Sequence, residues 1–270
     1  MYVSLPWYDL HELTSATDTL WRRIAGALRA AGVRDVPSEL DRRTPYEQQW
    51  RSGELLFGQA CGYDVAVAYA DALQVVATPC YRLEGCLGAT YRSLVVVRDD
   101  DPARTLADLR RRRCAVNTPT SHSGRNVLHA MVAPLSSGRQ FFADVVVSGG
   151  HEASLALLRH GVVDVAAVDC VTYALLARVR PAALGGTRVL AKTPRAPAPP
   201  YVTSTRTDRH TLAALRAALA EALADVRVAG ALHIAGLRWL ARADYRPIVE
   251  LERQAESLGA HELRACACAS

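Results

Sequence analysis

The sequence has almost no lysine: Lys192 is the only one, although lysine and arginine together number 32. The formal net charge of +5 therefore rests on arginine, and a lysine Schiff base could form only at Lys192. Long apolar runs are also missing, because Arg, Asp or His interrupts each stretch before the roughly 18 residues that a membrane helix needs. We therefore expect a soluble globular protein without membrane insertion.

Paired metal-binding or disulfide motifs are missing as well. The seven cysteines are an odd number and contain no Cys-x-x-Cys spacing, so we expect no zinc ribbon, no metal site and no complete disulfide framework. The first 13 residues contain Asp9, His11 and Glu12 and do not resemble a signal peptide. We expect a cytoplasmic protein as the sequence stands, and a periplasmic one if a leader is missing.

The length and composition predict two lobes with packed cores. Half of the residues are hydrophobic and 22% are charged, which excludes disorder and a fibrous repeat. A chain of 270 residues exceeds the roughly 100 to 150 residues of a typical single domain. Strand-like and helix-like segments alternate, and this order predicts an α/β fold with largely parallel sheets.

Residue patterns place the individual elements. The first predicted helix ends before Gly32, a usual C-terminal stop, and the proline-rich stretch 194–200 must be an extended connector. The predicted strands are 55–60, 73–77, 93–98, 114–117, 144–148, 163–169 and 201–205. The predicted helices are 16–31, 124–135, 151–160, 171–179, 212–226, 230–241 and 245–258.

A run of four arginines, Arg110–Arg113, has two interpretations. It follows the helical-looking segment 102–109, where cations favour the C-terminal end of a helix. A basic run can also form a nucleic-acid patch, but no aromatic-rich basic surface accompanies this one. We therefore predict a solvated helix end and no nucleic-acid partner.

Three polar junctions follow predicted strands. The first, Thr118–Gly124, lies before a helix, where unpaired N–H groups and hydroxyls suit a tetrahedral oxyanion. The second is Ser148–Ser154, and the third is Asp169 at the end of an apolar strand. Each junction could simply cap a helix or complement its dipole. Together they favour a binding site, because the carboxyl ends of strands in open α/β sheets converge on one crevice.

These junctions also carry a resemblance. Their order and spacing resemble those of the phosphate/phosphite/phosphonate ABC-transporter substrate-binding family. The similarity extends from near residue 5 to near residue 204, and the helical remainder fits the family's closing helices. The segments that carry it are Leu5–Asp9, Tyr91–Ser93, Ser121–Gly124, Ser148–Ser154, Gly161–Asp169 and Pro199–Ser204.

The resemblance implies a two-lobed type II periplasmic-binding-protein fold with a ligand clamped in the cleft between the lobes. Residues 1–92 plus 193–270 would form lobe 1, and residues 93–192 would form lobe 2. Tyr8 would then contact the ligand from lobe 1. The ligand-binding residues implied by position are Tyr8, Tyr91, Ser93, Ser121, His122, Ser123, Gly124, His151, Glu152 and Asp169.

Two classes of function remain open at this point. The leading interpretation is a solute-binding protein that captures a small phosphorus oxyanion for an ABC transporter's membrane subunits, or for a sensor or regulatory partner. The alternative is an enzyme on the same fold that acts on a small anionic metabolite, with His151, Glu152 and Asp169 as acids and bases. The sequence shows no nucleophile-base set and no cofactor fingerprint. We therefore predict a binding protein without catalytic residues or cofactor.

Overall fold

The computed structural model describes residues 1–258, which divide into two compact units. Unit 1 contains Met1–Arg82, Cys86–Thr90 and Pro197–Tyr245. Unit 2 contains Leu83–Gly85, Tyr91–Ala196 and the described residues from Arg246 onward. The assignment of the whole C-terminal part to lobe 1 is therefore wrong, because helix α8 (Arg246–Ser257) packs against α3 (Val127–Ser136) of unit 2.

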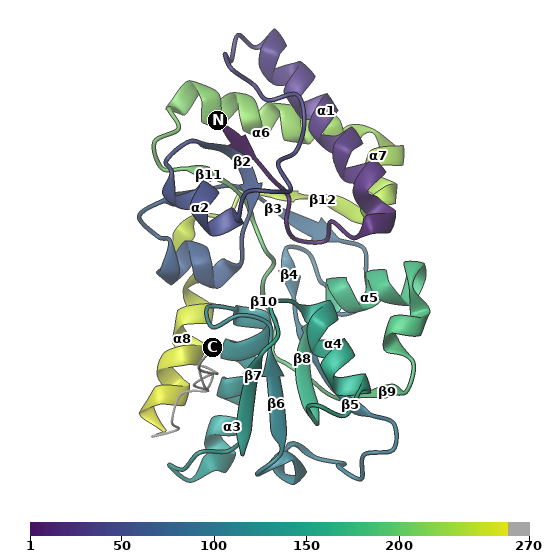
Figure 1. The fold of residues 1–270 in the computed structure, drawn as a ribbon. Helices are drawn as coiled ribbons and strands as arrows, with labels where there is room; N and C mark the ends of the chain where they lie inside the picture. Colours follow the sequence, from purple (N-terminus) through teal and green to yellow (C-terminus); the bar gives the residue numbers. More distant parts are fainter. Residues whose placement is uncertain (259–270) are drawn as a thin grey trace. The chain divides into compact units, whose positions relative to one another are not determined.

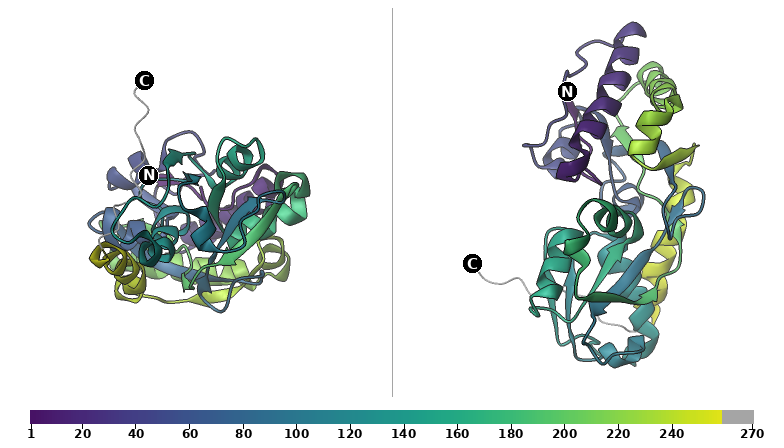
Figure 2. Two further views of the ribbon diagram at one scale, coloured as in Figure 1. Left: turned by 90° about the horizontal axis from the view of Figure 1, so that it is seen from below. Right: turned by 90° about the vertical axis from the view of Figure 1, so that its right-hand side faces the viewer.

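Unit 1 is built on a mixed five-stranded sheet with the strand order β1-β2-β11-β3-β12. The strands are β1 (Tyr2–Val3), β2 (Leu55–Gln59), β3 (Leu73–Tyr81), β11 (Tyr201–Ser204) and β12 (Ile234–Arg238). Only β1 and β2 pair in parallel, since β11 lies antiparallel between β2 and β3 and β12 is antiparallel to β3. Helices α1 (Thr14–Ala30) and α6 (Arg209–Ala224) pack side by side, as Figure 2 shows. The shorter helices are α2 (Tyr46–Arg51) and α7 (Val226–Ala231).

Unit 2 contains a second five-stranded sheet, in the order β7-β6-β8-β5-β9. Its strands are β5 (Ser93–Arg98), β6 (Arg113–Val116), β7 (Asp144–Val147), β8 (Val165–Asp169) and β9 (Thr187–Lys192). The first three strands in this order are parallel, whereas β5 is antiparallel to both β8 and β9. The prediction of largely parallel sheets is therefore wrong, because antiparallel pairs complete both sheets.

The helices of unit 2 cover both faces of its sheet (Figure 1). On one face, Leu128 and Val132 of α3 pack into a buried cluster with Val95 of β5. The other face carries α4 (His151–Arg159) and α5 (Cys170–Val179), both of which contact β8. The chain passes between the units within β4 (Thr90–Tyr91) and β10 (Ala196–Pro197), which pair as a two-stranded sheet. None of the helices within residues 1–258 has the length and hydropathy needed to cross a bilayer.

The ends of two predicted helices show where local signals succeed and fail. α1 ends at Ala30, and Gly32 adopts a φ of 82°, which confirms the predicted glycine stop. The predicted helix over 230–241 is wrong, because β12 occupies the middle of that segment. His233, with a φ of 54°, reverses the chain after α7, and β12 then pairs with the edge of β3. Pairing along this sheet edge overrides the local helical pattern.

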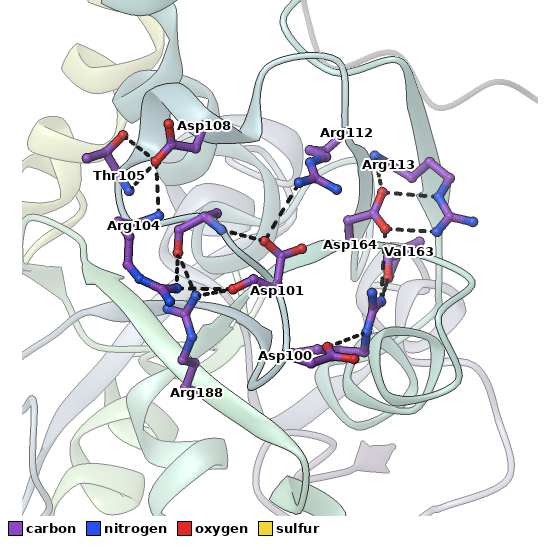
Figure 3. Close-up of polar contacts among 12 residues, drawn as sticks. Asp100, Asp101, Arg104, Thr105, Asp108, Arg112, Arg113, Val163, Asp164 and Arg188 are labelled. Atoms are coloured by element: carbon purple, nitrogen blue, oxygen red, sulfur yellow. Dashed lines mark hydrogen bonds and ion pairs between the residues drawn. The ribbon is translucent and has the colours of Figure 1, made fainter.

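The arginine run also differs from its predicted setting. Leu106–Leu109 forms only a short 3-10 turn, so Arg110–Arg113 does not follow an α-helix. Arg113 instead forms a two-pronged ion pair with Asp164, with Nη2 at 2.8 Å from Oδ1 and Nε at 3.1 Å from Oδ2 (Figure 3). Burial alone would raise the pKa of Asp164, but the hydrogen bonds from Arg113 hold it below its ordinary value. This part of the run is therefore a structural tie between the start of β6 and the segment before β8.

Candidate functional site

The carboxyl ends of the three parallel strands in unit 2 bring polar side chains together. Because β6, β7 and β8 run in the same direction, their carboxyl ends lie along one edge of the sheet. The turn after β6 carries Ser121 and Ser123, α4 begins with His151 after β7, and β8 ends at Asp169. These four residues were all predicted, and the structure gathers them in one cluster.

Short contacts connect the four side chains in a row. The hydroxyl oxygens of Ser121 and Ser123 lie 3.3 Å apart, and the Ser123 Oγ lies 2.8 Å from His151 Nε2. The same ring nitrogen lies 3.3 Å from Asp169 Oδ2. Ser121, Ser123 and Asp169 are buried, and we call this row of four residues the oxyanion cluster.

Two members of the oxyanion cluster also cap helices. The interpretation of these residues as helix caps is therefore correct as well. Ser121 Oγ accepts a hydrogen bond from the Gly124 backbone N–H at 3.0 Å. Asp169 accepts from the backbone N–H groups of Val171 and Thr172 at 3.0 and 2.9 Å. The Thr172 hydroxyl donates to the other Asp169 oxygen at 2.5 Å. Capping fixes both side chains where they face the cluster, so the two roles are compatible.

Gly124 occupies a position where no side chain fits. A Cβ on Gly124 would lie 1.9 Å from Asn117 Oδ1 and 3.1 Å from the Asn117 backbone nitrogen. Sequence reasoning did not select Asn117, although it follows β6 at the same sheet edge as the predicted residues. The close approach of the two segments explains why the turn into η4 (His122–Asn126) requires glycine at this point.

His122 is a buried, neutral histidine whose tautomer follows from its neighbours. The Asn126 amide nitrogen donates to the Ile248 carbonyl at 2.9 Å and lies 3.2 Å from His122 Nδ1. Because a carbonyl oxygen can only accept, this contact fixes the orientation of the amide, and its second N–H points to the ring. His122 Nδ1 is therefore the acceptor, and the ring carries its proton on Nε2. Burial lowers the pKa of His122 to about 3, so the ring is uncharged at neutral pH.

The Ser123, His151 and Asp169 trio lacks the geometry of a catalytic triad. In such a triad the serine and the carboxylate contact opposite nitrogens of the imidazole. Here both contact Nε2 of His151. Burial lowers the pKa of His151, while Asp169 and the Ala167 carbonyl partly oppose this shift. The arrangement offers a neutral ring and hydroxyls for binding, and it does not build a general base for the serine.

Two further predicted residues lie in the same part of unit 2. Ser93 of β5 pairs directly with Asp169 of β8, so their side chains lie on the same face of the sheet. The Thr193 hydroxyl oxygen accepts a hydrogen bond from the Ser93 backbone N–H at 2.9 Å, which holds the start of β5 in place. Tyr91 is buried, and its ring centroid lies 6.3 Å from that of His122.

The structure does not bring Glu152 into this cluster, and Tyr8 belongs to the other unit. Glu152 is exposed on α4, and its carboxylate forms an ion pair with Arg180. Tyr8 belongs to unit 1, where its ring packs edge-on against Tyr81 with a centroid distance of 5.3 Å. The backbone of Tyr8 adopts a φ of 63°, an unusual value for an aromatic residue. A ligand contact of Tyr8 stays a prediction.

Other types of site find no support among the residues that the structure describes. No group of three or more His, Cys, Asp and Glu side chains in residues 1–258 is arranged to hold a metal ion. Cys80 and Cys114 are buried free thiols, and Cys61 and Cys170 are buried as well. Burial raises the pKa of the Cys80 thiol, which keeps it protonated and unreactive at neutral pH.

Solved structures with a similar architecture show the fold of this protein. A Xanthomonas citri protein bound to a chloride ion has a TM-score of 0.72 at 17% identity, with 96% of this chain and 98% of that chain covered. A binding protein component of an ABC phosphonate transporter from Pseudomonas aeruginosa has a TM-score of 0.75 at 16% identity, covering 96% and 87%. PhnD1 from Prochlorococcus marinus in complex with methylphosphonate has a TM-score of 0.70 at 14% identity, covering 90% and 94%. The fold is thus the two-lobed type II fold of periplasmic binding proteins, as predicted.

The family assignment comes from the sequence. Residues 8–246 match the family described as "ABC transporter, phosphonate, periplasmic substrate-binding protein", and this chain belongs to that family. None of the curated proteins matches the chain at a significant level. The membership confirms a substrate-binding protein of phosphonate transport over the enzyme alternative. It also implies a small-molecule ligand and transporter membrane subunits as the kinds of partner.

Proposed function

We propose that this protein captures a phosphonate or a closely related phosphorus oxyanion at the oxyanion cluster and delivers it to the membrane subunits of an ABC transporter from the periplasm. The observation that carries the proposal is the unbroken row of contacts from Ser121 to Asp169 at a helix N-terminus. Family membership supplies the ligand class.

The local chemistry suits an oxyanion. η4 continues directly into α3, so the helix that begins at His122 extends to Ser136. The N-terminus of such a helix presents backbone N–H groups and a partial positive charge, which favour an anion. The hydroxyls of Ser121 and Ser123 add groups that can donate to oxygen. Hydrogen bonds from these donors would replace part of the ligand's hydration shell.

Asp169 sets a condition on the ligand's protonation. Its carboxylate is the acidic group of the oxyanion cluster, and two ionised oxyanions in a partly desolvated site repel each other. Glu152 does not add to this repulsion, because it pairs with Arg180. A ligand that keeps a P–OH group can donate to Asp169, and a ligand with an ammonium group can pair with it. Sulfate has neither group near neutral pH, so the site should reject it.

The first test replaces both serines. We expect Ser121→Ala/Ser123→Ala to weaken methylphosphonate binding at least tenfold in calorimetry, because a hydrogen bond to a charged group contributes about 1.5–3 kcal/mol. Losing a helix cap costs about 1 kcal/mol of stability. Asp208→Ala is the matched control, because it removes the cap of α6 in unit 1 without touching the cluster. Unchanged affinity in a folded double variant would leave the two serines as caps only.

The second test concerns the protonated ligand. Calorimetry should show tighter binding of methylphosphonate and phosphate than of sulfate, and methylphosphonate affinity should fall as pH rises through its second ionisation. Asp169→Asn should reduce the difference in affinity between methylphosphonate and sulfate, because the amide carries no charge and can donate a hydrogen bond to sulfate. Sulfate binding as tightly as methylphosphonate in the unaltered protein would refute the proposed role of Asp169.

A further inference from the structure

A pocket lies in unit 2, beside helix α5. Five residues of α5 line it, and their spacing of i, i+3, i+4, i+7 and i+8 places them on one face of the helix. The pocket has a volume of about 340 Å³, at the lower end of the roughly 300–1,000 Å³ typical of small-molecule sites. The five residues are Cys170, Tyr173, Ala174, Ala177 and Arg178.

The strand register separates this pocket from the oxyanion cluster. Leu94 of β5 lines the pocket and pairs with Lys192 of β9, so these two side chains lie on the same face of the sheet. Ser93 precedes Leu94, and neighbouring side chains in a strand point to opposite faces. Ser93 shares its face with Asp169 of the oxyanion cluster. The pocket therefore opens on the other face of β5.

The pocket combines an apolar floor with a charged rim. Leu83 and Leu94 are each 8% exposed, and Cys170 is 1% exposed, so the floor is shielded from solvent. At the rim, Lys192 lies 3.0 Å from a carboxylate oxygen of Glu84. Arg178 is a second, exposed cation of the lining. One carboxylate and two cations leave the lining with a net charge of +1.

Tyr173 adds a neutral polar group to the lining. Burial raises the pKa of its phenol, and the nearby carboxylates Asp99 and Glu84 raise it further. The hydroxyl group therefore keeps its proton at physiological pH and can donate a hydrogen bond.

From this combination we propose that the α5 pocket is a second ligand site, which binds a small amphipathic monoanion. The ligand would place an aromatic or short aliphatic body on the floor formed by Leu83 and Leu94. Its single acidic group would lie at the rim, near Lys192 and Arg178. The charge of the lining matches one negative charge, and the volume excludes a long lipid chain. This inference does not depend on the proposed function of the oxyanion cluster.

Two fluorescent probes with the same aromatic body test the inference. 1-Anilinonaphthalene-8-sulfonate carries one negative charge, whereas N-phenyl-1-naphthylamine lacks the sulfonate. We expect the sulfonate probe to bind with a stoichiometry of one per chain and at least fivefold more tightly than the neutral probe, because only the former meets the cationic rim. Equal affinity for the two probes would overturn the assignment of an anion site.

Four variants locate the binding. Ala174→Trp should fill the pocket and lower the affinity for the sulfonate probe at least tenfold. Ala217→Trp, at an exposed position on α6, should leave that affinity unchanged. Lys192→Met should lower the affinity for the sulfonate probe several-fold without changing the affinity for the neutral probe. Arg253→Met, on the exposed side of α8, is the control for this loss of a cation. Circular dichroism and thermal unfolding check that each variant is folded. Binding of the sulfonate probe that survives both pocket variants would refute the site.

A competition experiment separates the two sites of unit 2. Saturating methylphosphonate should leave the fluorescence of the bound sulfonate probe unchanged, because the pocket and the oxyanion cluster lie on opposite faces of β5. Displacement of the probe by methylphosphonate would place the probe in the oxyanion cluster and overturn the inference. A failure of methylphosphonate to bind would count only against the proposed function.

Discussion

The substitution Gly124→Ala tests the tightest packing at the oxyanion cluster. The new Cβ would lie 1.9 Å from Asn117 Oδ1 and 2.8 Å from Asn117 Cγ. Rotation of the Asn117 side chain can relieve both contacts. A third contact, 3.1 Å to the Asn117 backbone nitrogen, requires the turn itself to shift. That turn carries Ser121 and Ser123, so the substitution should disturb binding more than stability.

The expected magnitudes follow from two opposing effects. Overpacking a close contact costs about 1–3 kcal/mol. Alanine regains up to about 1 kcal/mol over glycine, because it loses less conformational entropy in a helix. The free energy of unfolding should therefore fall by about 0–2 kcal/mol, as measured by urea denaturation. Methylphosphonate affinity in calorimetry should fall at least tenfold, since displaced hydroxyls lose hydrogen bonds to the charged ligand.

A second substitution checks the cause. Asn117→Ala removes Oδ1 and Cγ but keeps the backbone nitrogen, so the double variant Gly124→Ala/Asn117→Ala should regain little of the lost affinity. Gly26→Ala in α1 is the matched control, because nothing lies within 4 Å of its Cβ, and it should stabilise the protein by about 1 kcal/mol. Wild-type affinity in the single variant, or full recovery in the double variant, would refute this packing argument.

Two further predictions concern buried charge. Burial holds the pKa of His122 at about 3 in the folded chain against about 6.5 when unfolded, so its contribution to stability is full above pH 6.5 and is lost as pH falls. Between pH 7.5 and pH 5, the free energy of unfolding measured with urea should fall by about 2 kcal/mol less for His122→Gln than for the unaltered protein. An equal fall in the two proteins would contradict the buried neutral ring. Arg113→Ala should lower the free energy of unfolding at pH 7, because it removes the hydrogen bonds that Arg113 donates to the Asp164 carboxylate and leaves only the longer ion pair with Arg98, at 4.0 Å. Thermal unfolding with the exposed variant Arg111→Ala as control measures this loss, and equal melting temperatures would show that the pair contributes nothing.

Local patterns in the sequence predicted many of the elements and much of the site. Alternating strands and helices predicted two α/β lobes, and Gly32 marked the end of α1. Polar residues at strand ends pointed to Ser121, Ser123, His151 and Asp169, because parallel strands bring their carboxyl ends to one edge. These features depend on chain direction and on short-range spacing, both of which can be read from consecutive residues.

Contacts between distant residues decided the rest. β12 replaced a predicted helix because the edge of β3 offered hydrogen-bond partners, and α8 joined unit 2 because α3 offered a packing surface. Glu152 forms an ion pair with Arg180 outside the oxyanion cluster, and local sequence patterns do not predict this pair.

The sequence by itself determined which residues could bind an oxyanion, because residue type and position at a strand end set the available donors. Only the tertiary structure decided their chemical state. The Ile248 carbonyl orients the Asn126 amide and thereby selects the tautomer of His122. The approach of Gly124 to Asn117 leaves no room for a Cβ in the turn that carries the serines. Both effects act over a few ångströms between segments that the local pattern does not connect, so composition and spacing could not predict them.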